Sequence, residues 1–172
     1  MSHRINGKWD LIIAHPPCTY ITNCGARWLM KDGEIVNYDR YEKGLDAVQF
    51  FMKLYNADCD RIAVENPVPS RVRKLPEYTQ IIEPYQFGHH VTKKTCLWLK
   101  GLPKLVPTND VGRPEPMYYI NKKGQKRSHC WTRLVNGGKD RAKNRAKTFQ
   151  GIADAMASQW SDYIKQEEMK GA

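Results

Sequence analysis

The chain has 172 residues, of which 41% are hydrophobic and 27% charged, which fits one compact domain and leaves too little chain for two of ordinary size. Its net charge of +10 favours a polyanionic partner such as nucleic acid, because clustered lysines and arginines displace counterions from phosphates; a merely soluble basic protein is the alternative. No apolar run approaches the roughly 20 residues of a membrane span, and the opening MSHRINGKWD lacks the apolar segment of a secretory signal, so we expect a cytoplasmic protein.

The first half of the chain carries the pattern of a strand, a helix and a second strand. The apolar run WDLIIA, residues 9–14, stops at a proline pair and predicts a short buried strand, and RIAVEN, residues 61–66, repeats that design. Between them, residues 38–57 predict an amphipathic helix with Asp39 as its N-cap. The expected buried stripe of this helix consists of Leu45, Val48, Met52 and Tyr55. Elements in this order predict a parallel strand pair joined by a right-handed crossover.

The second half of the chain predicts two more strands, a hairpin and a closing helix. The strands are expected at residues 80–83 and 94–100, and the hairpin at residues 117–131 with its turn at Lys123-Gly124. Residues 137–147, GGKDRAKNRAK, are too polar to pack and predict an exposed loop. From Thr148 a helix is expected, with a buried stripe at four-residue spacing formed by Ile152, Met156, Trp160 and Ile164.

Two chemically capable side chains follow the first two predicted strands. Cys18 comes directly after Pro16-Pro17, and Glu65 stands at the end of the second strand. Ligands in parallel sheets bind beyond the carboxyl ends of the strands, so both side chains are candidates for one site. A thiolate can attack an electrophilic ring carbon while a carboxylic acid protonates a ring nitrogen. The alternative is that Cys18 is a turn thiol and Glu65 a capping residue.

The order of HPPCT and VENP resembles the two central motifs of DNA cytosine C5-methyltransferases. In that family a Pro-Cys dipeptide supplies the nucleophile and a Glu-Asn dipeptide supplies the acid. The resemblance implies that Cys18 attacks C6 of cytosine and that Pro17 shapes the nucleophile loop. It further implies that Glu65 contacts N3 and the exocyclic amine, while Asn66 holds the loop.

A longer resemblance covers most of the chain. The runs IAHPPCTYITNCGARWL, IAVENPV, QFGHHVTKKTCLWLKGLP and TFQGIADAMASQW are similar to phage-borne proteins described as cytosine-methylase-like, which implies the cytoplasm of an infected host. Lys93 and Lys94 stand where the methyltransferases carry arginines, and they become candidates for phosphate or base contacts. The last run resembles the family motif that closes the cofactor pocket, so the implied cofactor is S-adenosylmethionine.

The family's opening strand and glycine turn, which hold S-adenosylmethionine, have no counterpart before the predicted nucleophile strand. We therefore expect an α/β fold with a Rossmann-like methyltransferase-type sheet, truncated at the N-terminal cofactor half. A second chain, or self-association, is expected to complete the site. Thr19 also stands where the family usually has glutamine, and the target-recognition region is reduced to about residues 103–147.

Most of the positive charge lies between residues 113 and 147. Eleven lysines and arginines stand there against Glu115 and Asp140, a local net charge of +9. Interleaved Tyr118, Tyr119, His129 and Trp131 favour base stacking, as in single-strand binding. A solvated basic loop is the alternative. The candidate nucleic-acid contacts are Lys122, Lys123, Lys126, Arg127 and Arg133.

A metal site is not expected, because the pairs His89-His90 and His129-Cys130 do not match zinc spacing. The five cysteines include no Cys-x-x-Cys pair and do not indicate a disulfide framework. The expected function is cytosine modification in DNA through a Cys18 adduct. The alternatives are a catalytically inactive DNA-binding or anti-defence module on the same fold, and a different covalent reaction at the pyrimidine ring.

Overall fold

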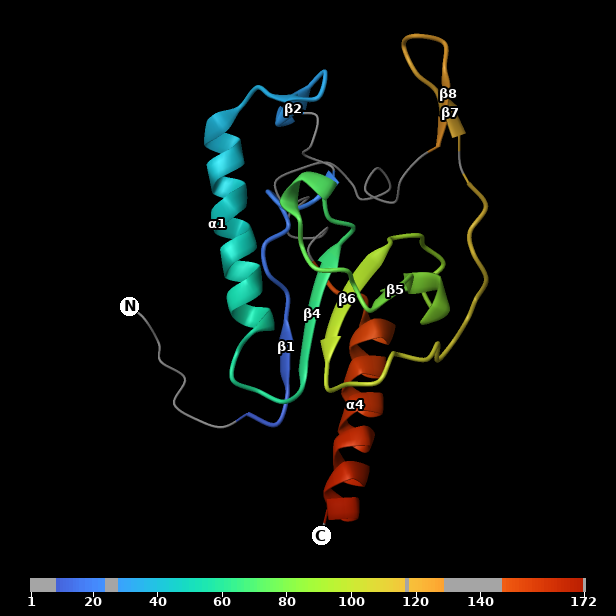
Figure 1. Cartoon of the computed structure of the whole chain (residues 1–172). Helices are drawn as coiled ribbons and strands as arrows, with labels where there is room; N and C mark the ends of the chain where they lie inside the picture. Colours follow the sequence, from blue (N-terminus) through green and yellow to red (C-terminus); the bar gives the residue numbers. More distant parts are fainter. Residues whose placement is uncertain (1–8, 24–27, 117, 129–146, 172) are drawn as a thin grey trace. The chain divides into compact units, whose positions relative to one another are not determined.

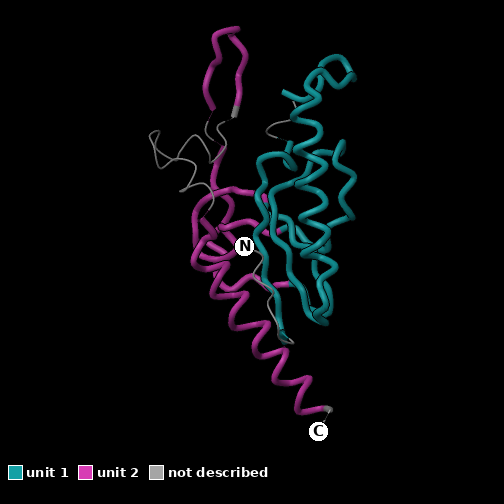
Figure 2. Tube along the Cα trace, turned by 90° about the vertical axis from the view of Figure 1, so that its left-hand side faces the viewer, with its two compact units in different colours: residues 1–81, 95–104 teal, residues 82–94, 105–172 magenta. Residues whose placement is uncertain are grey.

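A computed structural model describes residues 9–23, 28–116, 118–128 and 147–171 of the chain (Figure 1). The chain divides into two compact units, one of residues 1–81 and 95–104 and the other of residues 82–94 and 105–172 (Figure 2). The single domain expected from the length stays a prediction. Neither of the helices in the described residues is long and apolar enough to cross a membrane.

The larger sheet has four strands in the order β1-β4-β6-β5 (Figure 1). Strands β1 (Ile12–Ala14) and β4 (Ile62–Pro67) are parallel, which confirms the predicted strand pair. Strand β6 (Thr95–Lys100) runs antiparallel to β4, and β5 (Gln80–Ile82) lies at the edge beside β6. The sheet is therefore mixed, and the α/β class is confirmed in this coarser form.

The core of the first unit lies between this sheet and helix α1 (Tyr38–Tyr55). Phe51 of α1 and Trp98 of β6 are both fully buried, and their rings meet edge to face with centroids 4.9 Å apart. The indole nitrogen of Trp98 donates a hydrogen bond to Pro76 O at 2.8 Å, so the buried ring leaves no unsatisfied donor. Ile62 and Val64 of β4 belong to the same buried cluster.

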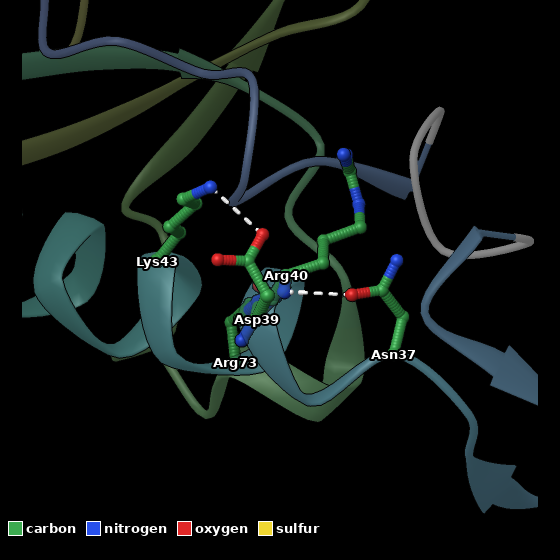
Figure 3. A network of polar contacts seen from close by, with 5 residues as sticks. All are labelled: Asn37, Asp39, Arg40, Lys43 and Arg73. Carbon is green, nitrogen blue, oxygen red and sulfur yellow. Dashed lines mark hydrogen bonds and ion pairs between the residues drawn. The ribbon is translucent and has the colours of Figure 1, made fainter.

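Helix α1 differs from the prediction at its start and in its buried face. Asn37, not Asp39, is the N-cap, and its side-chain oxygen accepts a hydrogen bond from Arg40 N at 2.9 Å (Figure 3). Asp39 lies inside the first turn and pairs with Lys43 at 2.7 Å. Leu45 is 44% exposed, whereas Gly44 and Phe51 are buried. The predicted Met52 and Tyr55 do pack, partly buried, against the core. The predicted face is therefore confirmed near the end of the helix and wrong at its start, where a glycine that no hydrophobic pattern reports is buried in place of Leu45.

A small hairpin precedes α1 that the sequence analysis did not predict. Strands β2 (Met30–Lys31) and β3 (Glu34–Ile35) pair antiparallel. The two residues between them, Asp32 and Gly33, have φ values of +51° and +90°. Positive φ at both positions is the geometry of a tight hairpin turn, for which Asp-Gly is a favoured pair.

The second unit contains the predicted hairpin and the closing helix. Strands β7 (Tyr118–Ile120) and β8 (Lys126–Ser128) pair antiparallel, and Gly124 in the turn has φ +73°. Helix α4 (Gln150–Gly171) buries the predicted Ile152, Met156 and Trp160, and Ile164 is half-buried. Of the predicted polar loop at residues 137–147, all but the last residue lie outside the described residues.

Candidate functional site

The register of β1 on β4 brings the two predicted motifs to the same end of the sheet. Within the strands each residue of β1 pairs with the residue 50 positions later, ending at Ala14 opposite Val64. The next two positions keep this offset. His15 Nδ1 lies 3.0 Å from Glu65 Oε2, and Asn66 Nδ2 donates to Pro16 O at 2.9 Å. The segments HPP and EN are therefore joined by two side-chain hydrogen bonds.

Glu65 is held by a residue that the sequence analysis did not select. The side chain of Glu65 is only 16% exposed, whereas that of its partner His15 is 42% exposed. A ring nitrogen of histidine can donate or accept, so the direction of this hydrogen bond depends on the tautomer of His15. The sequence could have indicated His15. In a parallel pair with Ala14 opposite Val64, the next residue after each is His15 and Glu65.

Asn66 contacts the loop that the resemblance expects it to hold. The residue is 1% exposed, and its amide nitrogen must face Pro16 O, because a carbonyl only accepts hydrogen bonds. Asn66 Oδ1 consequently points elsewhere and has no hydrogen-bond partner within the described part of the chain. Its role in the reaction stays a prediction.

Cys18 stands at the start of a tight turn and is exposed. Ile21 N and Thr22 N both donate to Cys18 O at 3.1 Å, so the chain turns back immediately after the thiol. Ile21 is fully buried, and its carbonyl accepts a hydrogen bond from Ser70 N at 2.8 Å. Pro17 is exposed beside Cys18. A direct approach of Cys18 Sγ to Glu65 stays a prediction.

Two arginines that the sequence analysis did not select contact the residues after Cys18. Arg40, in the first turn of α1, donates through Nη2 to Thr19 O at 2.9 Å. Arg73, in the 3₁₀ turn η2 (Arg71–Arg73), donates through Nε to Tyr20 O at 2.8 Å. Both contacts are to main-chain oxygens, so no motif in the sequence could have indicated them.

The other predicted contacts belong to the second unit. Lys93 Nζ lies 5.7 Å from the centre of the Phe149 ring, and Lys94 is exposed. Their approach to Cys18 stays a prediction.

The β7–β8 hairpin presents its basic side chains to solvent on both faces. Tyr118 is 54% exposed, and Lys126 Nζ lies 4.3 Å from the centre of its ring. Asn121 Oδ1 accepts from Lys123 N and Gln125 N, both at 2.9 Å, which fixes the turn. The predicted Lys122, Lys123, Lys126 and Arg127 are all exposed. The predicted Arg133 and the aromatic residues His129 and Trp131 lie outside the described residues.

Within the described residues, no group of three or more His, Cys, Asp or Glu side chains is placed to hold a metal ion. His89 Nε2 accepts a hydrogen bond from Gly151 N at 3.0 Å at the start of α4, and Cys96 is buried in β6. His89 thus binds the main chain at the start of α4, and Cys96 lies buried within its strand.

No protein-family model, no curated protein and no solved structure matches this chain. What bears on its function is therefore the geometry of the described residues. Two motifs distant in sequence meet where β1 has ended, with Glu65 and Asn66 still inside β4 rather than beyond its end, as the sequence analysis had expected for Glu65. An exposed thiol follows the first motif, and two arginines bind the main chain beyond that thiol.

Proposed function

We propose that the protein modifies cytosine in DNA through a covalent adduct at Cys18, as a DNA cytosine C5-methyltransferase-like protein. The proposed fold is a Rossmann-like methyltransferase-type sheet. The observation that carries the proposal is the continued parallel register, which joins HPP to EN through the His15–Glu65 and Asn66–Pro16 contacts. This brings the predicted acid to the segment that leads directly into the predicted nucleophile.

The adduct step needs one nucleophile and one proton. The thiolate of Cys18 forms a bond to C6 of cytosine, and the C5–C6 π pair moves to form a C4–C5 double bond. The former C4–N3 π pair moves onto N3, which takes a proton from Glu65. His15 Nδ1 lies 3.0 Å from the carboxyl oxygen Oε2 of this proposed acid. The product is an enamine whose C5 is nucleophilic.

The described residues do not fit S-adenosylmethionine. In the methyltransferases that the chain resembles, that cofactor is held by a strand followed by a glycine-containing turn. Strand β1 is instead followed by two prolines, which have no N–H to offer, and α1 begins after the β2–β3 hairpin. A second chain, or a second copy of this one, would have to supply the cofactor.

The β7–β8 hairpin supports nucleic acid as the substrate class. Between Tyr118 and Ser128 it carries four positive charges and no negative one, and the charged side chains are exposed. A ribbon of two strands fits the major groove, and exposed tyrosines stack on unpaired bases. The hairpin would thus hold DNA, in the cytoplasm of the host cell that the phage-like resemblance implies.

The proposal is tested with DNA in which 2-pyrimidinone replaces cytosine. Its ring lacks the 4-amino group and is more electrophilic at C6, so the adduct can form without a methyl donor. Incubation with single-stranded and duplex oligonucleotides, followed by a denaturing gel and intact mass, should give an adduct of one protein and one oligonucleotide. Cys18→Ala should abolish it, and Cys59→Ala, at a buried cysteine, should not. Failure of the wild-type protein to form an adduct on either DNA would contradict an enzymatic role.

The second candidate is an inactive DNA-binding or anti-defence module on the same fold. The poor fit to S-adenosylmethionine favours it, together with a basic hairpin that needs no catalytic residue to bind DNA. In that case DNA binding should be strong, steeply dependent on salt, and unchanged by Cys18→Ala combined with Glu65→Ala.

A further inference from the structure

The loop after Cys18 is held by its carbonyl oxygens. Pro16 and Pro17 carry no N–H, so the main chain leading into Cys18 offers acceptors and no donors. Beyond Cys18, the carbonyls of Thr19 and Tyr20 accept hydrogen bonds from two different guanidinium groups, at 2.9 and 2.8 Å. Two successive carbonyls, between the exposed Cys18 and the buried Ile21, are thus fixed by side chains from two other elements.

Arg73 ties this loop to the first turn of α1. Besides its bond to Tyr20 O, its Nη1 donates to Tyr41 O at 3.0 Å and its Nη2 to Arg40 O at 3.1 Å. The planar guanidinium thereby binds three carbonyls from two segments that are about 20 residues apart in sequence. A lysine ammonium could not reproduce that fork, because its three donors diverge from a single nitrogen.

The position of Arg73 is electrostatically unfavourable. The residue is only 5% exposed, and among the described residues no ion pair joins it to a carboxylate. Burial lowers the pKa of its guanidinium below the ordinary value, and the charge of Arg40 lowers it further. A residue needed only to fill this space would be apolar. The three carbonyls that it binds compensate part of the cost of burying this charge.

Gly44 makes room for this contact. In a helix each Cβ tilts towards the N-terminus, so a side chain at position 44 would cover the carbonyls of Arg40 and Tyr41. A Cβ built on Gly44 would lie 1.9 Å from Arg73 Cζ and 2.1 Å from both of its terminal nitrogens. Only glycine leaves these two carbonyls open to the guanidinium.

Arg40 contacts the same loop through its side chain and contacts Arg73 through its main chain. Its guanidinium donates to Thr19 O and lies 5.0 Å from the centre of the Tyr20 ring, a cation–π distance. Its carbonyl is one of the acceptors of Arg73. Figure 3 shows the side chain of Arg40 extending away from α1, while Asn37, Asp39 and Lys43 make their contacts along the helix.

We propose that Arg73 and Arg40 are positioning residues that hold the Cys18 loop by its carbonyls and so fix where the thiol is presented. These two arginines and the carbonyls that they bind are called the clamp below. This inference rests on the proposed function for one point only, the reaction that the thiol performs. The restraint on the loop is a property of the free protein and can be measured without any substrate.

The first experiment measures amide hydrogen exchange in the protein alone. Ile21 N and Thr22 N, which close the turn after Cys18, report on the loop, and amides of β4 and β6 report on the sheet. Arg73→Lys and Arg40→Ala should each speed exchange at the two loop amides by about 10-fold, with the sheet amides unchanged. Arg71→Ala, at an exposed arginine of the same 3₁₀ turn, should change neither. Unchanged loop exchange, or equal acceleration in the sheet, would overturn the proposal.

The second experiment measures the rate of adduct formation with the 2-pyrimidinone DNA. Both clamp variants should slow the adduct by about 10-fold at saturating DNA while the dissociation constant for DNA stays within about twofold. A global loss of structure would instead slow adduct formation and weaken DNA binding together. If the wild-type protein forms no adduct, the proposed function is wrong, and the exchange experiment still decides whether the clamp exists. Should Arg73→Lys fail to fold, the half-buried Arg40→Ala provides the same two measurements.

Discussion

The substitution Gly44→Ala tests the clamp without altering any residue that makes a hydrogen bond in it. In the interior of an ordinary helix, alanine is more favourable than glycine by about 0.8–1.0 kcal/mol. If Gly44 were only a helical residue, the variant would be more stable than the wild-type protein. The clamp predicts the opposite sign, because the new methyl group would occupy the place of the Arg73 guanidinium.

The size of the effect follows from the contacts that would be lost. A Cβ 1.9 Å from Arg73 Cζ forces the guanidinium to move away from α1. An arginine on the surface would swing aside, but Arg73 is 5% exposed, and the movement breaks its bonds to Arg40 O and Tyr41 O. Hydrogen bonds from a charged group contribute about 1.5 kcal/mol or more each. After the gain in helix propensity, we expect a net loss of about 2 kcal/mol in the free energy of unfolding.

Urea unfolding followed by circular dichroism measures this value, and a double-mutant cycle assigns it. In an Arg73→Met background the obstacle is flexible and uncharged, so Gly44→Ala should there recover most of its helix-propensity gain. The coupling between the two positions should therefore be about 2–3 kcal/mol. The reasoning is refuted if Gly44→Ala alone raises the free energy of unfolding by about 1 kcal/mol, or if the two substitutions are additive.

Three further predictions concern other parts of the chain. His15→Gln should slow formation of the 2-pyrimidinone adduct by about 10–100-fold, because glutamine keeps a polar contact but cannot hold a proton; an unchanged rate would exclude His15 from the proton transfer. Asn37→Ala should lower the free energy of unfolding by about 1 kcal/mol, and Asp39→Ala by less than half of that; the reverse order would contradict the observed cap. The four cations of the β7–β8 hairpin are Lys122, Lys123, Lys126 and Arg127. Replacing all four by alanine should reduce the slope of log K against log salt for DNA binding by roughly 3–4. An unchanged slope would show that DNA binds to another part of the protein.

The elements that the sequence predicted best are those in which the determining residues are neighbours. The closing helix buries Ile152, Met156 and Trp160 because a spacing of four returns to the same face of a helix, whatever surrounds it. The hairpin turn at Lys123-Gly124 depends on a glycine that accepts positive φ. The Asp32-Gly33 turn carries an equally local signal for the β2–β3 hairpin, and it was available from the sequence alone.

The face of α1 could not be predicted in the same way. A hydrophobic pattern selects Leu45, since it is the most apolar residue of that turn, and it passes over Gly44. The side of α1 that is buried at this turn is set instead by Arg73, almost 30 positions later, because its guanidinium binds two carbonyls of the helix that must stay uncovered. An arginine is expected at the surface, so neither its burial nor its three acceptors leaves a sign in the local sequence.

The same reasoning changes what the proline pair contributes to the candidate site. Fixed φ angles at Pro16 and Pro17 restrain the approach to Cys18, but they also remove two N–H groups that could have donated from this segment. Several of the carbonyls in and around the loop accept hydrogen bonds. Asn66 binds Pro16 O, two amides of the turn bind Cys18 O, and Ser70 N binds Ile21 O. The arginines supply the two bonds in between, at Thr19 and Tyr20. The motif that supplies the thiol thus depends on donors from α1, β4 and η2, and a chain that keeps PPC and EN but lacks those donors would present its cysteine on a less restrained loop.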